Sequence, residues 1–227
     1  MNNPLLDLEG LPPFSRIKPE HVVPAVDQLL GDARKRVDEL LALKGPFNWR
    51  NLVEPLEILD DRLNRAWSPV SHMNSVVNSE ALREAYNACL PKLSDYATEM
   101  GQNERLFAAY GQVAEGGESL NQAQRKLLDN ALLDFHLSGV DLPEASKARF
   151  KEINQALSRL TSKFEENVLD ATHAWSKLIK DPQALAGLPE SAMGLARQTA
   201  EQRDEAGWML TLEFPSYLPV MTYADNR

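Results

Sequence analysis

A long helical stripe of apolar residues most constrains how this chain can fold. After Pro143, apolar side chains recur in steps of three and four residues, the spacing that places them on one face of an α-helix. A helix of this length would run roughly 45 Å at 1.5 Å per residue, longer than one compact bundle needs. The stripe consists of Phe150, Ile153, Leu157, Leu160, Phe164, Val168 and Ala171.

The same spacing predicts several helices before this one. The first begins near Pro19 and ends before Gly45, and the second, from Leu52 to Trp67, is expected to be interrupted at Ser68-Pro69. Pro55 falls in the first turn of this second helix or kinks it.

Capping residues set the boundaries of the next helices. Ser79 is a candidate N-cap for a third helix, which Pro91 should bend, and a short helix covers residues 104–113. The following helix closes at Gly139, and two capping boxes could open it: Ser119 with Gln122, or Asn121 with Gln124.

Near the end of the chain the periodicity changes from helix to strand. Apolar and polar residues alternate over 208–214, and the credible partner for such a strand is 175–179. A helix after Pro189, ending before Gly207, lies between the two strands. The sequence therefore predicts a mainly α protein with long helices and one small antiparallel β piece, 175–179 with 208–214.

Composition excludes several functional classes. Lys and Arg total 24 against 33 Asp and Glu, a net charge of −9, which disfavours nucleic-acid binding. The densest basic run, Arg34 to Arg36, lies between acidic residues. No apolar run approaches a membrane span and no secretion signal is evident, so we expect a cytoplasmic protein without nucleic-acid or membrane partners.

The candidates for catalysis are weak. Glu166, Asp170 and His173 share one helical face and resemble half of a di-iron site, but no second such stripe exists, so a solvated face is the better interpretation. The single Cys89 is expected to be a buried, inert thiol. We expect no catalytic residue and no metal ligand in this chain. The His-Glu-x-x-His, Gly-x-Ser-x-Gly and phosphate-loop motifs are absent, and the other histidines are His21, His72 and His136.

Two further local predictions concern turns. His72 and Asn74 are tempting as substrate contacts, but a hydrogen-bonded turn after Pro69 is favoured for them, and the residues that bind substrate stay unknown. Residues 215–219 read as a rigid loop, after which Asp225 or Asn226 resembles an N-cap with no helix following. We therefore expect a chain cut from a longer protein.

Several segments together resemble one known family. The chain is similar, in this order and essentially end to end, to the N-terminal part of the thimet-oligopeptidase-like zinc metallopeptidases. That family's zinc-binding motif has no matching position here, so the resemblance implies no metal ligand in this chain. The segments are residues 11–25 (LPPFSRIKPEHVVPA), 68–75 (SPVSHMNS), 166–172 (ENVLDAT), 186–190 (AGLPE) and 211–221 (TLEFPSYLPVM).

The resemblance implies a role within a larger hydrolase. Residues 1–227 would form the N-terminal helical domain of a zinc metalloendopeptidase, with 190–227 leading into the missing catalytic part. This domain would form one wall of the substrate channel, its partners being short peptides and the protein's own C-terminal catalytic half. Zinc would be bound only in the full-length protein. Residues 208–223 are the expected surface toward that half, and the alternative is a freestanding helical interaction module without enzymatic activity.

Overall fold

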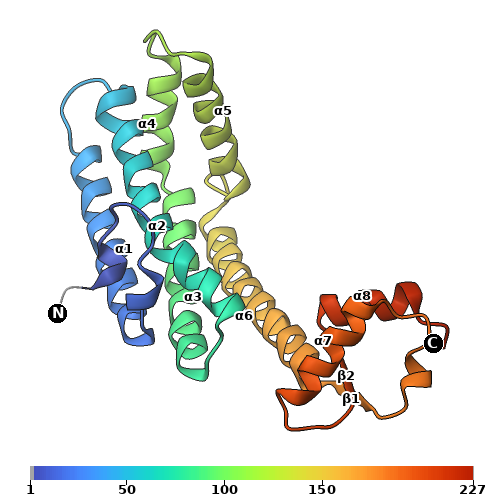
Figure 1. The fold of residues 1–227 in the computed structure, drawn as a ribbon. Helices are drawn as coiled ribbons and strands as arrows, with labels where there is room; N and C mark the ends of the chain where they lie inside the picture. Colours follow the sequence, from blue (N-terminus) through green and yellow to red (C-terminus); the bar gives the residue numbers. More distant parts are fainter. Residues whose placement is uncertain (1–2, 227) are drawn as a thin grey trace. The chain divides into compact units, whose positions relative to one another are not determined.

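The computed structural model describes residues 3–226, which form eight α-helices and one two-stranded sheet (Figure 1). This confirms the predicted mainly α class. The chain divides into two compact units, one up to Leu160 and the other from Thr161 onward. The elements in chain order are η1 (Pro4–Leu6), η2 (Phe14–Arg16), α1 (Pro19–Leu41), η3 (Trp49–Val53), α2 (Glu54–Val76), α3 (Glu80–Gly101), α4 (Glu104–Glu115), α5 (Gln122–Leu137), α6 (Glu144–Ala174), β1 (Ser176–Ile179), η4 (Pro182–Leu185), α7 (Glu190–Glu201), β2 (Trp208–Thr211) and α8 (Phe214–Tyr223).

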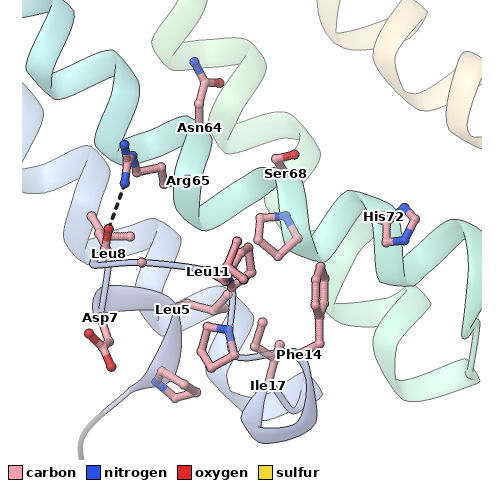
Figure 2. Close-up of a pocket in the computed structure, with 15 residues that line it drawn as sticks. Leu5, Asp7, Leu8, Leu11, Phe14, Ile17, Asn64, Arg65, Ser68 and His72 are labelled. Carbon is pink, nitrogen blue, oxygen red and sulfur yellow. Dashed lines mark hydrogen bonds between the residues drawn. The ribbon is translucent and has the colours of Figure 1, made fainter.

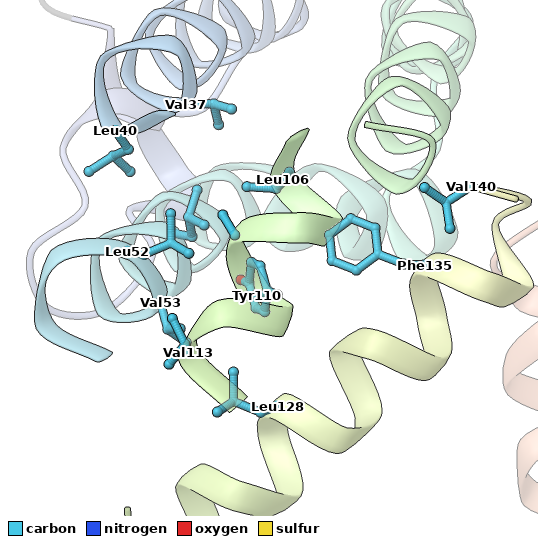
Figure 3. Close-up of a cluster of buried hydrophobic side chains, with 12 residues drawn as sticks. Val37, Leu40, Leu52, Val53, Leu106, Tyr110, Val113, Leu128, Phe135 and Val140 are labelled. Atoms are coloured by element: carbon cyan, nitrogen blue, oxygen red, sulfur yellow. The ribbon is translucent and has the colours of Figure 1, made fainter. Parts of the chain in front are cut away.

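Two apolar clusters hold the first unit together. In one, α1 packs on α2 and α3, and fully buried side chains such as Val22, Val70 and Cys89 meet there. In the other, α4 packs on α5 and the end of α1 joins them; Figure 3 shows Leu106, Val113 and Leu128 within it. Helical apolar stripes that face one another thus build the cores of this unit.

Local signals placed most helix ends correctly. Pro19 begins α1, and the backbone amide of Asn121 donates to Gln124 Oε1 at 2.9 Å while the amide of Gln124 donates to Asn121 Oδ1 at 2.9 Å. The second of the two possible capping boxes therefore opens α5. Gly139 follows the helix with φ +85°, a conformation that favours glycine.

The predicted interruption at Ser68-Pro69 is wrong, because α2 runs unbroken through it to Val76. A proline within a helix costs about 3 kcal/mol through a lost hydrogen bond and a steric clash. Here the helix continues because Pro69 and Val70 are both buried, and Val70 belongs to the cluster against α1. Helix α3 likewise continues through Pro91, and Pro55 lies in the first turn of α2.

Helix α6 forms as predicted, but its exposure differs from expectation. Phe164 of the apolar stripe is 69% exposed, whereas Glu166, expected on a solvated face, is only 8% exposed. The prediction of a solvated Glu166 is therefore wrong, although Asp170 and His173 are exposed. Periodicity identifies which side chains share a helical face; it does not identify which face another part of the protein covers.

The second unit contains the predicted β piece. Strands β1 and β2 pair antiparallel, with Ser176 opposite Thr211 and Ile179 opposite Trp208. The second strand ends at Thr211 rather than at residue 214. Between the strands, α7 begins after Pro189 as predicted and ends at Glu201, before Gly207.

The rigid loop predicted at residues 215–219 is also wrong, because these residues lie in α8. Pro215 occupies the first turn, where its missing N–H costs nothing. The amide of Thr211, at the end of β2, donates to Ser216 Oγ at 2.9 Å, which fixes the start of the helix against the strand. The N-cap role of Asp225 or Asn226 stays a prediction.

Candidate functional site

The histidines make separate local contacts and do not form a common site among the described residues. His21 Nδ1 accepts a hydrogen bond from the backbone amide of Lys18 at 3.1 Å, at the start of α1. His136 pairs with Asp141 near the end of α5. Within residues 3–226 no group of three or more His, Cys, Asp or Glu side chains could hold a metal ion. That this chain supplies no catalytic or metal-binding residue stays a prediction.

His72 and Asn74 lie within α2 and not in the predicted turn, since the helix continues past Pro69. The backbone oxygen of Asn74 accepts a hydrogen bond from Asn78 Nδ2 at 2.8 Å, which supports the end of the helix. The His72 ring lies 5.9 Å from the ring of Phe14. Neither geometry points to proton transfer.

Cys89 is fully buried between α1 and α3, as expected from its place on an apolar helical face. Burial raises the pKa of its thiol to about 11. A thiol with a raised pKa carries little thiolate at neutral pH, and the thiolate is the nucleophile. Cys89 therefore acts as a small apolar core residue.

One pocket lies between the N-terminal segment and α2 (Figure 2); we call it the N-terminal pocket. It has a volume of about 720 Å³, and its lining is dominated by proline and leucine side chains with Phe14 and Ile17. Arg65 Nη1 donates to the carbonyl oxygen of Leu8 at 3.1 Å and holds the segment in place. Such a pocket can receive an apolar side chain; of its polar lining, Asp7 is paired with Arg16 at 3.3 Å.

A second pocket, the bundle pocket, has a volume of about 650 Å³ and is lined by residues of α1 to α5. It combines apolar side chains with Glu57 and Asp60 of α2, Tyr96 of α3 and Tyr110 of α4. Both side chains are exposed at the pocket mouth, and partial desolvation of the carboxyl groups raises their pKa; the charge of Asp60 adds to the effect on Glu57.

The charge of Asp60 acts on both tyrosines of this pocket. Burial and the neighbouring charge of Asp60 raise the pKa of Tyr96 to about 12, while Arg34 acts in the opposite direction. Burial, Glu57 and Asp60 together raise the pKa of Tyr110. Sequence reasoning did not single out this group, because the two carboxyls and the two tyrosines lie on three different helices. The available signal was the spacing of Glu57 and Asp60, which places them on one side of a helix.

No helix among residues 3–226 is both long and apolar enough to cross a membrane. Neither the N-terminal pocket nor the bundle pocket, as the described residues form them, contains a group of three or more His, Cys, Asp or Glu side chains that could hold a metal ion. The described residues can bind and exclude ligands by shape and charge.

Comparison with known proteins assigns the chain. It is 53% identical over its whole length to oligopeptidase A of Haemophilus influenzae and 52% identical to that of Escherichia coli, covering 34% of each. It is also 36% identical to a probable cytosolic oligopeptidase A of Arabidopsis thaliana, covering 33% of it. The chain thus spans about a third of the length of these relatives.

A family model confirms the resemblance found in the sequence. The model for the N-terminal domain of neurolysin and thimet oligopeptidase matches residues 26–147, more than half of the chain. These residues include α2 to α5 and most of α1, the helices that surround the bundle pocket. The chain therefore belongs to the neurolysin/thimet oligopeptidase family and carries its N-terminal domain.

Proposed function

We propose that this chain is the non-catalytic N-terminal region of a cytoplasmic zinc metalloendopeptidase that hydrolyses short peptides. The end-to-end match to one third of oligopeptidase A supports this most directly. Residues 1–227 would form the N-terminal helical domain, and 190–227 would lead into the catalytic part.

The chain's own contribution would be steric. The donor set for zinc is missing from residues 3–226, so the metal that the family resemblance implies would be held by another part of the protein. The helices of this chain would form one wall of the substrate channel, which admits short flexible peptides and excludes folded proteins. Size selection of this kind needs no reactive side chain.

The catalytic half is the proposed occupant of an apolar face on α8. Phe214, Tyr217, Leu218 and Met221 follow the helical spacing i, i+3, i+4, i+7, and all four are exposed. A contiguous exposed apolar face of this kind marks an interaction surface. Because the chain covers 34% of each of these relatives, they contain about twice its length in additional residues. Such residues could cover the α8 face.

A peptidase assay tests the proposal. We expect the chain ending at Arg227 to hydrolyse no short peptide, because it lacks His-Glu-x-x-His. We expect the protein extended by its downstream coding sequence to cleave short peptides, to lose this activity with a zinc chelator, and to leave folded proteins intact. Chelator-sensitive hydrolysis by the shorter chain, or a stop codon directly after Arg227, would contradict the proposal.

Light scattering tests the α8 face. We expect the 227-residue chain to self-associate with rising concentration, and Leu218→Asp to reduce that association because a carboxylate opposes apolar contact. Leu11→Asp is the control, since Leu11 is 91% exposed and belongs to the first unit, not to α8. Equal association of wild type and Leu218→Asp would count against this surface.

A freestanding helical interaction module is the second candidate. The exposed apolar side chains Leu157 and Leu160 on α6 favour it, because such a stripe suits a partner helix. It predicts a coding sequence that stops after Arg227, whereas the peptidase predicts continuation with His-Glu-x-x-His downstream.

A further inference from the structure

The bundle pocket contains two carboxylates without a cationic partner. Glu57 and Asp60 lie one turn apart on α2 and line the cavity, and within the described residues 3–226 neither forms an ion pair. By contrast, the adjacent residue Asp61 does have a cationic partner, because its carboxylate accepts a hydrogen bond from Arg65 Nε at 2.7 Å. Neither carboxylate is thus directly paired with a cation among residues 3–226.

Two nearly buried tyrosines line the same cavity. Tyr96 and Tyr110 are only 7% and 6% exposed, and both line the pocket. Neither hydroxyl has a hydrogen-bond partner among residues 3–226, yet no fully buried side-chain oxygen in that range lacks one. Each hydroxyl oxygen is therefore accessible to solvent, and both residues line the pocket. A nearly buried polar group normally has a partner, so the two hydroxyls have unused capacity for a ligand.

The rest of the lining suits an alkyl chain. Leu59, Met100 and Leu127 contribute apolar walls, and Figure 3 shows Leu106, Tyr110 and Phe135 together in the neighbouring cluster. All charged side chains of the lining are exposed: Glu57 and Asp60 on α2, and Lys126 and Asp134 on α5. The lining thus holds three carboxylates and one ammonium group. Arg34, 5.4 Å from the centre of the Tyr96 ring, is paired with Glu99, so the pocket as a whole favours a cation.

We propose that the bundle pocket binds a primary ammonium group carried on an alkyl chain, either a lysine side chain of a peptide or a free alkylamine. The ammonium group has three N–H donors, which match the Glu57 and Asp60 carboxylates and a tyrosine oxygen. The alkyl chain lies along the apolar walls. This site does not rest on the proposed peptidase function, because it is built entirely from residues of the first unit.

Calorimetric titration of the 227-residue chain tests the site with three probes. These are N-acetyl-lysine N-methylamide, n-pentylamine, and the neutral N-acetyl-norleucine N-methylamide. We expect saturable binding of the lysine derivative or of pentylamine and much weaker binding of the norleucine derivative. Binding of the lysine derivative identifies a peptide ligand, whereas binding of pentylamine alone identifies a free amine. Absence of binding by both amines would overturn the proposal.

Matched variants locate the bound amine. Glu57→Gln with Asp60→Asn should weaken binding by about tenfold or more, since both charged acceptors of the ammonium group are removed. Tyr110→Phe should weaken it by a smaller factor. Asp61→Asn removes a charge from the adjacent position on α2 but not from the pocket, and should change affinity by less than about twofold. Equal losses in Asp61→Asn and in the double variant would show a general charge effect and refute the site.

Folding of the variants is checked by circular dichroism and urea unfolding. The double variant should be at least as stable as wild type, because it removes two like charges that lie close together. A loss of affinity in a fully folded double variant, with Asp61→Asn unaffected, would then assign the effect to the pocket.

Discussion

Leu128→Ala is expected to lower the free energy of unfolding by about 2–5 kcal/mol, the range for removing a large aliphatic side chain from a packed core. Leu128 lies on α5 and is 1% exposed within the cluster formed with α4. The loss combines the transfer free energy of the removed methyl and methylene groups with the cavity that remains. Urea unfolding followed by tryptophan fluorescence measures the change.

Leu133→Ala provides the matched control on the same helix. Leu133 is 54% exposed, so its truncation should change the stability by less than about 0.5 kcal/mol. The two variants share residue type, helix and change in propensity, and differ only in burial. Similar losses in both would show that α5 does not bury the face described here.

Gly187→Ala is expected to destabilise the second unit by about 2 kcal/mol or more, from two separate costs. Gly187 has φ +89°, which an L-residue adopts only with strain. An added Cβ would also collide with the carbonyl oxygen of Tyr223 and stand 3.0 Å from the amide nitrogen of Asp225. The end of α8 would have to move, and the hydrogen bond from the Asp225 amide to the Ala186 carbonyl oxygen, 3.0 Å long, would be lost.

Hydrogen exchange at the Asp225 amide reports this loss directly, alongside urea unfolding. Gly194→Ala is the control: Gly194 lies inside α7 with no atom within 4 Å of an added Cβ. It should stabilise the protein by about 0.5–1 kcal/mol, because alanine loses less backbone freedom on folding than glycine. Unchanged protection of the Asp225 amide in Gly187→Ala would contradict the close approach described here.

Sequence reasoning predicted the elements that local chemistry specifies. The capping box at Asn121, the helix start at Pro19 and the glycine at 139 act through groups within a few residues of one another. The pairing of 175–179 with 208–214 could also be predicted, because the strand pattern had one suitable partner. The family followed from segments of sequence spread along the whole chain.

The proline predictions failed where burial outweighed local preference. Pro69 should end a helix, but α2 continues because Val70 packs into a core whose other members lie far away in the sequence. Residues 215–219 contain two prolines and looked like a loop, yet Ser216 anchors them to β2 as a helix. Propensity is a weak prior that tertiary packing overrides.

The sequence by itself determined the helical class, most element boundaries, the β piece and the family, because periodicity and capping are local properties. Only the tertiary structure decided that Glu166 is buried while Phe164 is exposed, and that Glu57, Asp60, Tyr96 and Tyr110 share one pocket. The physical reason is that burial and electrostatic proximity depend on residues brought together from different helices, which no local pattern records.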